Sequence, residues 1–489
     1  MNHSQHKEDQ GQSQLPKIVI AGASGYIGGN LIKELMNDAQ IIALTRKVSS
    51  QQQANQQVTW RTCDLFSMLE AEECLRGADY AVYLVHSMIP SARLTQGSFQ
   101  DMDVILADNF AQAAVKAGVK QIVYLSGLIP NTEHLSRHLK SRLEVEQVLS
   151  SYTVPVTTLR AGLIVGPRGS SFPILVKLVK RLPIMLLPQW TQTKTHPIAL
   201  VDVIHALQQC IGHTPVYHKI IDLGGPEVMT YKEMMVLTAK ALGKTRYLLQ
   251  IPYFTVTLSR LWVSLTTQTP KNLVYPLIES LIHPMTAQPE RMVEGISFGK
   301  TPFLQSAIDA IHIENELINH QSKQPYQRKS STSSVQEDTV RSVQRLYVPE
   351  GRDAVWVAMH YIKWLAYFLK PLIRVEIEDT HNCRLYALIG KKPLLELTFS
   401  EIRSTPLRAL FYITGGKLAS TRGSHPGRME FRFIPGTNAC MAAIHDFMPA
   451  LPWFIYKYTQ AKMHLWVMSR FKKHLLRMSK DASSAKNMI

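Results

Sequence analysis

The sequence predicts an α/β domain built on a doubly wound parallel sheet with a small substrate lobe, followed by a basic α+β domain compatible with a helix-grip fold. Three observations lead to this prediction. Strand and helix signals alternate over residues 16–210, which is typical of a parallel sheet covered on both faces. Three glycines join the first strand to the first helix. A polar, serine-rich stretch over residues 319–340 cannot bury enough apolar surface to fold, and it separates the two parts as a linker.

The turn after the first strand is the most informative segment. An apolar strand at residues 18–20 leads into glycines at positions 22, 25 and 28, and a helix with apolar residues at helical spacing follows. Gly22 lets the chain turn sharply, Gly25 leaves room for backbone N–H groups to approach a pyrophosphate, and Gly28 lets the helix pack closely. The helix N-terminus would then face the phosphates. We predict a dinucleotide site that includes Gly22, Ser24, Gly25, Tyr26, Ile27 and Gly28; the alternative is a tight turn without a ligand.

The other elements of the first domain follow in order. The pattern predicts strands at residues 41–45, 58–61, 80–85, 121–125 and 156–160, and helices at residues 69–75, 101–117 and 134–149. From about residue 170 to 315 amphipathic segments with prolines replace the alternation. This change predicts a small lobe that covers the substrate.

The end of the second strand bears on the choice between NAD and NADP. An acidic residue there would bind the ribose 2′-hydroxyl, whereas an arginine accommodates a 2′-phosphate. The sequence reads Leu44-Thr45-Arg46-Lys47, and Arg46 has the planar fork that suits a phosphate. We therefore expect NADP(H) to be preferred and NAD(H) to be the alternative; without a ligand, Arg46 would be a solvated surface arginine.

Several motifs together resemble the extended and atypical short-chain dehydrogenase/reductase superfamily over about residues 16–314. Members often read T-G-A-x-G-[FY]-[IV]-G at the glycine turn. The stretches Leu159-Arg160-Ala161-Gly162 to Pro167 and His196-Pro197-Ile198 to Val203 are similar to two later family motifs. Tyr83 to Met88 and Ser126 to Pro130 resemble NmrA-like bacterial proteins that carry an uncharacterised C-terminal domain. The resemblance implies a nicotinamide dinucleotide as cofactor.

The resemblance also implies cofactor contacts after the third and fourth strands. Asp64 and Leu65 match an Asp-[LV] pair that lies beside the adenine, although Asp64 could instead cap the next helix. Val85 and His86 end the fourth strand, where the ribose would pass. A lone histidine is more often structural than functional.

The catalytic positions depart from the family. Ser126 matches the serine that hydrogen-bonds a substrate carbonyl or hydroxyl, but the following Y-x-x-S-K-x-E-x-E frame carries His138 and Arg142 in place of Tyr and Lys. His138 could exchange a proton, because histidine has a pKa of about 6.5. Arg142 could hold the ribose but stays protonated. Two functions follow: an oxidoreductase or isomerase acting on a hydrophobic small molecule, or a non-catalytic nucleotide-binding sensor or accessory protein.

The C-terminal domain carries most of the net charge. Residues 341–489 contain 23 Lys and Arg against 10 Asp and Glu, a net of +13 out of +17 for the chain. We expect helices at 355–369 and 452–476 and strands at 373–378, 394–399 and 429–434, the last half-buried because apolar and charged residues alternate. The basic segment 470–477 could lie on anionic lipid, or its cations could simply complement a helix C-terminus. This domain would hold or deliver the hydrophobic ligand.

The remaining sequence features indicate where the protein is located and which partners are expected. Residues 1–15 are polar and lack the apolar run of a signal peptide, which predicts a disordered leader and a cytoplasmic protein, with contact at the inner face of the membrane as an extension. Five cysteines without close spacing predict reduced thiols. Charges interrupt the apolar windows at 355–373 and 447–468, so we expect no transmembrane helix. We expect neither a metal site nor a nucleic-acid partner.

Overall fold

The computed structural model describes residues 15–47, 56–86, 92–169, 171–251, 255–323, 339–421 and 426–486. The chain divides into two compact units. The first comprises Met1–Val85 and Asp108–Ile318, and the second comprises His86–Ala107 and Asn319–Ile489. The predicted leader, apart from Leu15, and most of the predicted linker lie outside the described residues.

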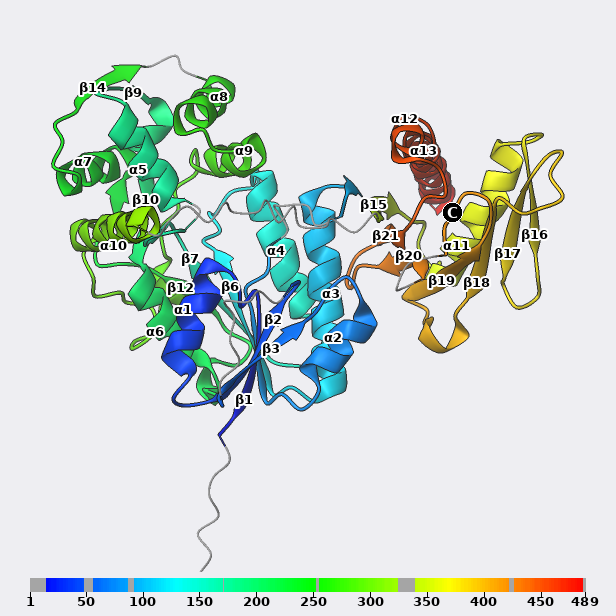
Figure 1. Cartoon of the computed structure of the whole chain (residues 1–489), viewed down its shortest axis with the longest axis horizontal. Coiled ribbons are helices and arrows are strands. Elements are labelled where there is room, and N and C mark those ends of the chain that lie inside the picture. Colours follow the sequence, from blue (N-terminus) through cyan, green and yellow to red (C-terminus); the bar gives the residue numbers. More distant parts are fainter. Residues whose placement is uncertain are drawn as a thin grey trace, which may run out of the picture. The chain divides into compact units, whose positions relative to one another are not determined.

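The first unit contains a parallel sheet of seven strands in the order β12-β7-β6-β4-β1-β2-β3 (Figure 1). The strands are β1 (Lys17–Ala21), β2 (Gln40–Thr45), β3 (Val58–Thr62), β4 (Tyr80–Tyr83), β6 (Gln121–Gly127), β7 (Val156–Ala161) and β12 (Ile220–Leu223). This order confirms the predicted doubly wound sheet. The seventh strand, β12, comes from the region that we assigned to the lobe.

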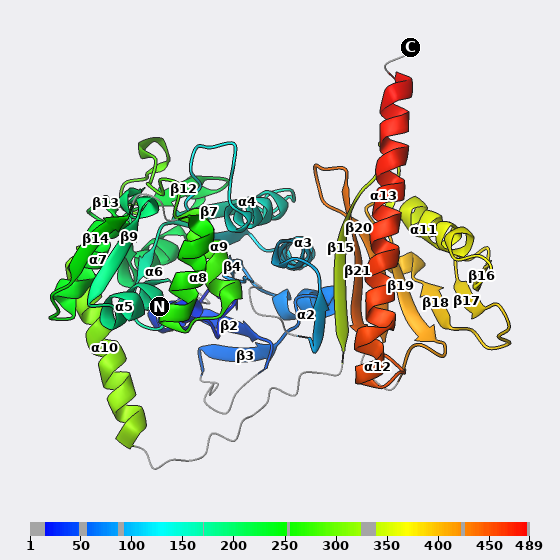
Figure 2. The same ribbon diagram turned by 90° about the horizontal axis from the view of Figure 1, so that it is seen from above.

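Helices cover both faces of this sheet (Figures 1 and 2). They are α1 (Tyr26–Leu35) and α6 (Leu200–Cys210) on one face and α2 (Met68–Leu75), α3 (Phe99–Ala117) and α4 (Arg137–Leu149) on the other. Leu31 of α1 and Leu207 of α6 pack with Ile18 and Ile20 of β1 in one buried cluster. Because both faces are covered, the strands in the middle of the sheet, β1, β2 and β4, are mostly apolar.

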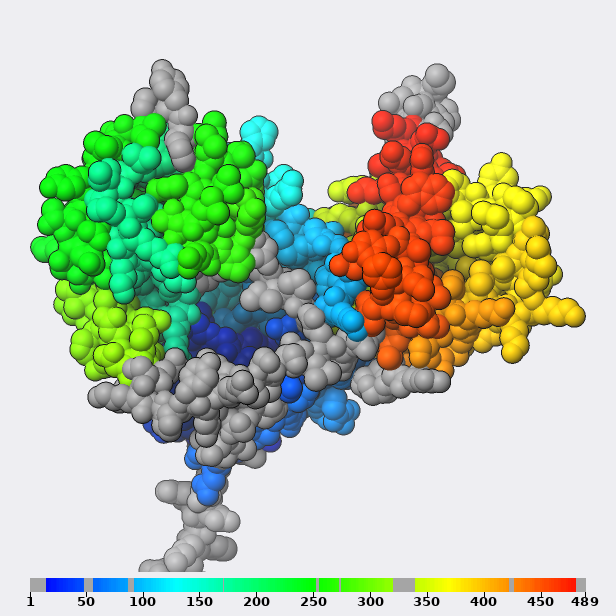
Figure 3. All heavy atoms as spheres, turned by 45° about the horizontal axis from the view of Figure 1, so that its top comes forward, coloured from blue at the N-terminus to red at the C-terminus, as the bar shows by residue number. Residues whose placement is uncertain are grey.

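The lobe has its own apolar core, which includes Phe172, Trp190, Met234 and Phe303. It contains α5 (Phe172–Arg181), β9 (Ile184–Pro188), α7 (Tyr231–Ala241), β14 (Tyr247–Ile251), α8 (Val256–Thr267), α9 (Lys271–Ser280) and α10 (Phe303–Lys323). Short strands β8 (Ile164–Val165), β10 (Lys194–Thr195), β11 (Ile198–Ala199) and β13 (Met229–Thr230) link the lobe to the sheet domain. In the space-filling view the dark blue N-terminal residues are visible in a hollow below the green residues of the lobe (Figure 3).

The second unit is an eight-stranded sheet with a long terminal helix. The strand order is β16-β17-β18-β19-β20-β21-β15-β5. The elements are β5 (Leu94–Gln96), β15 (Val340–Tyr347), α11 (Ala354–Phe368), β16 (Ile373–Ile377), β17 (Cys383–Ala387), β18 (Leu395–Phe399), β19 (Arg408–Gly415), β20 (Gly427–Phe433), β21 (Ala439–Phe447), α12 (Trp453–Tyr458) and α13 (Gln460–Lys486). The pairing is antiparallel except between β15 and β5.

This arrangement confirms the predicted α+β domain. A strand, a helix, six antiparallel strands and a long terminal helix follow one another, as in a helix-grip fold (Figure 2). Phe471 of α13, Tyr361 of α11 and Phe431 of β20 share one buried cluster. The segment 86–107, which the sequence pattern assigned to the first domain, adds β5 to the edge of this sheet.

The prediction of a half-buried β20 is wrong. Phe431 packs in the core as expected, but Glu430 and Arg432 on the other face are only 2 % and 3 % exposed. Glu430 accepts hydrogen bonds from Arg408 at 2.9 Å and from Arg432 at 3.0 Å, and His445 lies 3.1 Å from its other oxygen. Because these charges are paired, a strand that alternates apolar and charged residues can be buried on both faces.

All five cysteines are free and buried. Cys63 and Cys74 are eleven positions apart in the sequence, and the Cys74 thiol donates to the backbone carbonyl of Thr62, the residue before Cys63, at 3.7 Å. Among the described residues, no helix combines the length and the hydropathy that crossing a membrane requires.

Candidate cofactor-binding site

The glycine turn lies at the point where the strand order of the parallel sheet reverses. From β1 the chain proceeds through β2 and β3 to one edge, and then crosses to β4 on the other side of β1. In doubly wound sheets, ligands bind beyond the carboxyl ends of the strands at this point. Gly22 to Tyr26 follow β1, and Leu84 follows β4, so both segments border the expected site.

Two of the glycines are required by close backbone packing. Gly22 has a φ of 87°, in the left-handed region that favours glycine, and a Cβ there would lie 3.0 Å from the backbone of Leu84. A Cβ at Gly28 would overlap the carbonyl oxygen of Gly22. The carbonyl of Gly22 also accepts a hydrogen bond from the N–H of Gly25 at 2.9 Å. The turn therefore folds tightly onto the first turn of α1.

The N-terminus of α1 is open to an anionic ligand. Gly25 occupies the N-cap, so no side chain caps the first N–H groups of this helix, and its first turn carries no acidic residue. Ser24 and Gly25 are exposed beside them. The N–H groups of Tyr26, Ile27 and Gly28 have the arrangement in which helix N-termini bind phosphate.

The Tyr26 side chain packs against the loop that follows β8. A Cβ at Gly166 would overlap the Tyr26 hydroxyl, so the glycine in this loop makes room for the phenol. The hydroxyl is buried and has no hydrogen-bond partner in the described part of the chain. Burial raises the pKa of Tyr26. Tyr26 is therefore a wall of the site rather than an acid or base at neutral pH.

Arg46 and Lys47 are exposed at the carboxyl end of β2. Leu44 pairs with Ala21, so Arg46 lies two residues beyond the strand pair that leads into the glycine turn. The Thr45 hydroxyl donates to the backbone carbonyl of Lys47 at 3.1 Å and shapes this strand end. The placement is compatible with a cation beside the ribose of a bound dinucleotide.

Asp64 stabilises the turn after β3. Its Oδ1 accepts a hydrogen bond from the N–H of Phe66 at 3.1 Å. The alternative role of Asp64 as the cap of α2 is wrong, because Ser67 is the N-cap residue and accepts from the N–H of Glu70. The carbonyl of Leu65 accepts a hydrogen bond of 2.7 Å from the buried amide of Asn109.

The predicted residues after β4 fall into different units. The strand ends at Tyr83, earlier than expected, and Val85 closes the first segment of the first unit. His86 belongs to the second unit, where its Nδ1 lies 2.7 Å from Oδ2 of Asp103. A cofactor contact of Val85 or His86 stays a prediction.

Ser126, His138 and Arg142 lie on neighbouring elements of the first unit. Ser126 is near the end of β6, 3 % exposed, and its hydroxyl has no hydrogen-bond partner among the described residues. His138 and Arg142 are one turn apart on the same face of α4. Arg142 donates to the hydroxyl of Tyr124 at 3.4 Å. Their catalytic roles stay predictions.

Helix α4 is fixed at both ends, which sets the positions of His138 and Arg142. At its N-terminus Ser136 caps the N–H of Leu139, and the Ser136 hydroxyl lies 2.8 Å from that of Ser280 in α9. Nearer its C-terminus Glu146 accepts two hydrogen bonds from the buried Arg160 of β7. Arg160 belongs to the motif at residues 159–167, and an arginine within a buried strand is the sequence signal for a buried acidic partner.

Arg160 has a second carboxylate nearby on β12. Asp222 pairs with Arg160 in the sheet register and is 1 % exposed. Burial raises the pKa of Asp222, although the N–H of Gln288 donates to it at 2.9 Å. Within the described ranges, no three His, Cys, Asp or Glu side chains gather as metal ligands.

Comparisons with known proteins agree with this architecture. The model of the NmrA-like family matches residues 14–277. The auxiliary protein GraX of Staphylococcus aureus is 32 % identical over 143 residues, 29 % of this chain and 43 % of GraX. A UDP-glucose 4-epimerase of Vibrio cholerae is 21 % identical over 266 residues, 50 % of this chain and 81 % of the epimerase. The chain thus spans less than half the length of GraX.

Solved structures resemble part of the chain. The triphenylmethane reductase of Citrobacter sp., complexed with NADP(H), has a TM-score of 0.48 and 17 % identity and covers 60 % of this chain and 99 % of its own. The family model covers more than half of the 489 residues, including every strand of the parallel sheet. The chain belongs to the NmrA-like family.

Proposed function

We propose that this protein binds NADP(H) at the glycine turn and acts as an oxidoreductase or isomerase on a hydrophobic small molecule. The observation that carries the proposal is the turn itself. Gly22 and Gly28 fold it onto α1, and the uncapped N-terminus of α1 lies at the reversal of the strand order. Phosphate groups are the ligands that this geometry suits.

The preference for NADP(H) over NAD(H) is supported by Arg46 and Lys47. Both are exposed at the end of β2, where an acidic residue would favour NAD. Arginine binds phosphate through two parallel hydrogen bonds, and the lysine adds a second charge. Arg46 would hold the 2′-phosphate.

The enzymatic role is supported by Ser126 and His138. A buried hydroxyl without a partner costs about 1–3 kcal/mol, and a substrate oxygen beside Ser126 would supply the missing hydrogen bond. His138 is partly exposed on α4 and would exchange a proton with the substrate. Arg142 would orient the ribose, since it cannot release a proton. When bound, the nicotinamide supplies or accepts the hydride.

Titration with NADPH and NADH, followed by turnover assays, tests the proposal. The fluorescence of NADPH should change saturably when the purified chain is added, and the chain should oxidise NADPH with one member of a panel of quinones, aldehydes and ketones. Turnover should fall at least tenfold in His138→Ala and stay unchanged in Lys140→Ala, because Lys140 is exposed on the same helix. Failure to bind either nucleotide would refute the site.

A second candidate function is that of a nucleotide-binding sensor or accessory protein. It is favoured by the replacement of the Tyr/Lys pair and by the hydrogen bond that Arg142 makes to Tyr124. GraX, a relative of part of this chain, is described as an auxiliary protein. Tight nucleotide binding without turnover across the whole panel would support this function. The free, buried cysteines are compatible with the cytoplasmic location that we propose for either function.

A further inference from the structure

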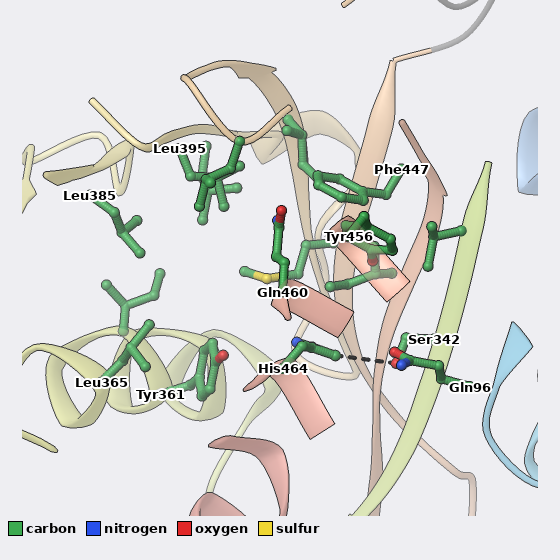
Figure 4. A pocket seen from close by; sticks show the side chains of 17 residues that line it. Gln96, Ser342, Tyr361, Leu365, Leu385, Leu395, Phe447, Tyr456, Gln460 and His464 are labelled. Atoms are coloured by element: carbon green, nitrogen blue, oxygen red, sulfur yellow. Dashed lines mark hydrogen bonds between the residues drawn. The ribbon is translucent and has the colours of Figure 1, made fainter. Parts of the chain in front are cut away.

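The second unit contains a cavity of about 120 Å³ between its sheet and helices α11, α12 and α13 (Figure 4). Its wall is mostly apolar, with Leu365 from α11, Leu395 and Ile413 from the sheet, and Tyr456 from α12. An engineered apolar cavity of about 150 Å³ is known to hold benzene. The cavity therefore has room for a molecule, or the end of one, of about the size of a single ring.

Besides the two tyrosines, Tyr361 and Tyr456, the cavity is lined by four side chains with polar groups: Gln96, Ser342, Gln460 and His464. Nε2 of His464 lies 3.2 Å from the hydroxyl oxygen of Ser342. The Gln96 amide donates to the carbonyl of Ala461 at 3.0 Å, which fixes the orientation of the amide group. In Figure 4 the tip of Gln460 lies near the middle of the cavity, and Gln96 lies beside Ser342.

Two amide oxygens of this cluster lack hydrogen bonds. Oε1 of Gln96 and Oε1 of Gln460 are buried and have no partner in the part of the chain that the structure describes. A buried acceptor without a partner has lost its hydrogen bonds to water, and this loss destabilises the fold. A ligand that brings a hydrogen-bond donor into an otherwise apolar space would remove this cost. Because both free groups are acceptors, the ligand that fits them best carries a hydrogen-bond donor.

The cavity carries no charge at neutral pH. Its lining, all within the described residues, contains no Lys, Arg, Asp or Glu. Burial lowers the pKa of His464 to about 4, so its ring is neutral. A carboxylate would find no cation in this lining, and it would lose its hydration on entering a mostly apolar space. An anionic ligand is therefore disfavoured.

We propose that this cavity binds a neutral, ring-sized apolar molecule with a hydroxyl group, an alcohol or a phenol, whose O–H donates to Oε1 of Gln460. The aliphatic and aromatic wall would bury the ring. The inference rests only on the second unit and is independent of the nucleotide site.

Calorimetric titration of the full chain with phenol, benzene and benzoate tests this inference. Phenol should bind saturably and at least tenfold more tightly than benzene, and benzoate should not bind. Gln460→Leu should weaken phenol at least tenfold and leave or strengthen benzene. Gln147→Leu, on the exposed face of α4, is the matched control and should change neither.

Three results would overturn it. They are equal competition of benzoate with phenol, an unchanged phenol affinity in Gln460→Leu, and the absence of saturable binding for all three compounds, in which case water alone would fill the cavity. A circular dichroism spectrum of Gln460→Leu separates loss of the hydrogen bond from loss of the fold. If the variant does not fold, Gln460→Met serves instead, because methionine removes the amide oxygen but keeps the length of the side chain, and phenol should then bind no more tightly than benzene.

A different observation concerns the outer surface of α12 and α13. Phe454, Tyr458 and Trp466 are 76 %, 53 % and 46 % exposed. The amino groups of Lys457 and Lys462 lie 5.7 and 5.3 Å from the ring centre of Tyr458, and the guanidinium of Arg470 lies 5.9 Å from that of Trp466. Phe471, the aromatic residue of the basic segment 470–477, is instead fully buried. The exposed aromatics thus precede the segment that the sequence suggested.

We infer that this aromatic and basic surface docks on an anionic phospholipid bilayer. Tryptophan and tyrosine are enriched where protein meets the headgroup region, and lysine and arginine are attracted to anionic lipids. Residues 341–489 carry a net charge of +13, which complements such a surface.

Sedimentation with vesicles tests the docking surface. The full chain should bind vesicles of phosphatidylcholine with 30 % phosphatidylglycerol and leave pure phosphatidylcholine vesicles unbound. The double variant Phe454→Ser, Trp466→Ser should lose at least fivefold in binding, whereas Tyr247→Ser, an exposed aromatic of β14, should not. Equal binding to both vesicles would overturn the inference. So would a self-association in solution that the double variant abolishes, because the partner would then be a second copy of the chain.

Discussion

Arg160 of β7 and Glu146 of α4 form a buried ion pair with two hydrogen bonds. Nε of Arg160 lies 3.0 Å from Oε2 of Glu146, and its terminal nitrogen lies 2.7 Å from Oε1. Both side chains are almost completely buried. The pair joins the helix that carries His138 and Arg142 to the strand beside Ser126, so it positions the candidate catalytic side chains without contacting a substrate.

Removal of one partner of this pair should strongly destabilise the first unit. In Glu146→Ala the guanidinium of Arg160 stays buried, with only Asp222 on the next strand to balance it. We expect a loss of about 3–5 kcal/mol in the free energy of unfolding, measured by urea denaturation. The double variant Glu146→Leu, Arg160→Leu should recover part of the loss. A change below about 1 kcal/mol in Glu146→Ala would contradict a structural role for the pair.

The adjacent glycines Gly28 and Gly29 provide a matched test of the turn. A Cβ at Gly28 would overlap the carbonyl of Gly22, whereas a Cβ at Gly29 would have no neighbour closer than 3.9 Å. Gly28→Ala should therefore weaken NADPH binding more than tenfold in a fluorescence titration. Gly29→Ala should preserve binding and raise stability by up to about 1 kcal/mol, because alanine favours the helix. Equal affinities in the two variants would show that the tight packing at Gly28 is not needed for the site.

The elements that the sequence predicted well are those whose signal is local. The apolar runs of β1 and β6 and the periodicity of α1 and α11 fall where expected, because hydrophobic periodicity reports burial directly. β12 has four residues and carries the buried Asp222, so its signal is short and contains a charge. β5 exists only through its pairing with β15, 246 positions later at Val340 and Leu94. Such long-range pairing leaves no periodic trace.

The side chains of the candidate site and the buried polar residues show the same difference between local and long-range signals. The glycine turn was predictable because the backbone conformation demands glycine at fixed positions. The burial of Glu430 and Arg432 was not predictable, because charged residues that alternate with apolar ones are typical of a solvent-facing strand. Arg408 and His445, which pair with Glu430, are brought beside it only by the fold. The N-cap of α2 is Ser67 and not Asp64 for a similar reason. Serine and aspartate both cap helices, so the sequence does not distinguish them, and the conformation of the turn determines which one lies at the N-cap.

Arg46→Asp should reverse the nucleotide preference. The exposed guanidinium would be replaced by a carboxylate that repels a 2′-phosphate and accepts a hydrogen bond from a 2′-hydroxyl. NADPH affinity should fall at least tenfold, while NADH affinity should stay within threefold or rise. Arg76→Asp, an exposed arginine at the end of α2, controls for the general change in charge. An equal loss of affinity for NADPH and NADH would show that Arg46 does not contact the 2′-phosphate.

The neutral form of His464 should make the second unit sensitive to mild acid. Burial lowers the pKa of His464 to about 4 in the folded chain, against about 6.5 when unfolded. Between these values the unfolded chain binds a proton that the folded chain excludes, so His464 contributes stability at pH 7 that is lost as the pH falls from 6.5 to 4. The stability difference between the native chain and His464→Gln should therefore shrink by about 2–3 kcal/mol over this range, measured by denaturant unfolding. A difference that stays constant with pH would mean that His464 is hydrated and titrates normally, and the cavity beside it would then be open to water.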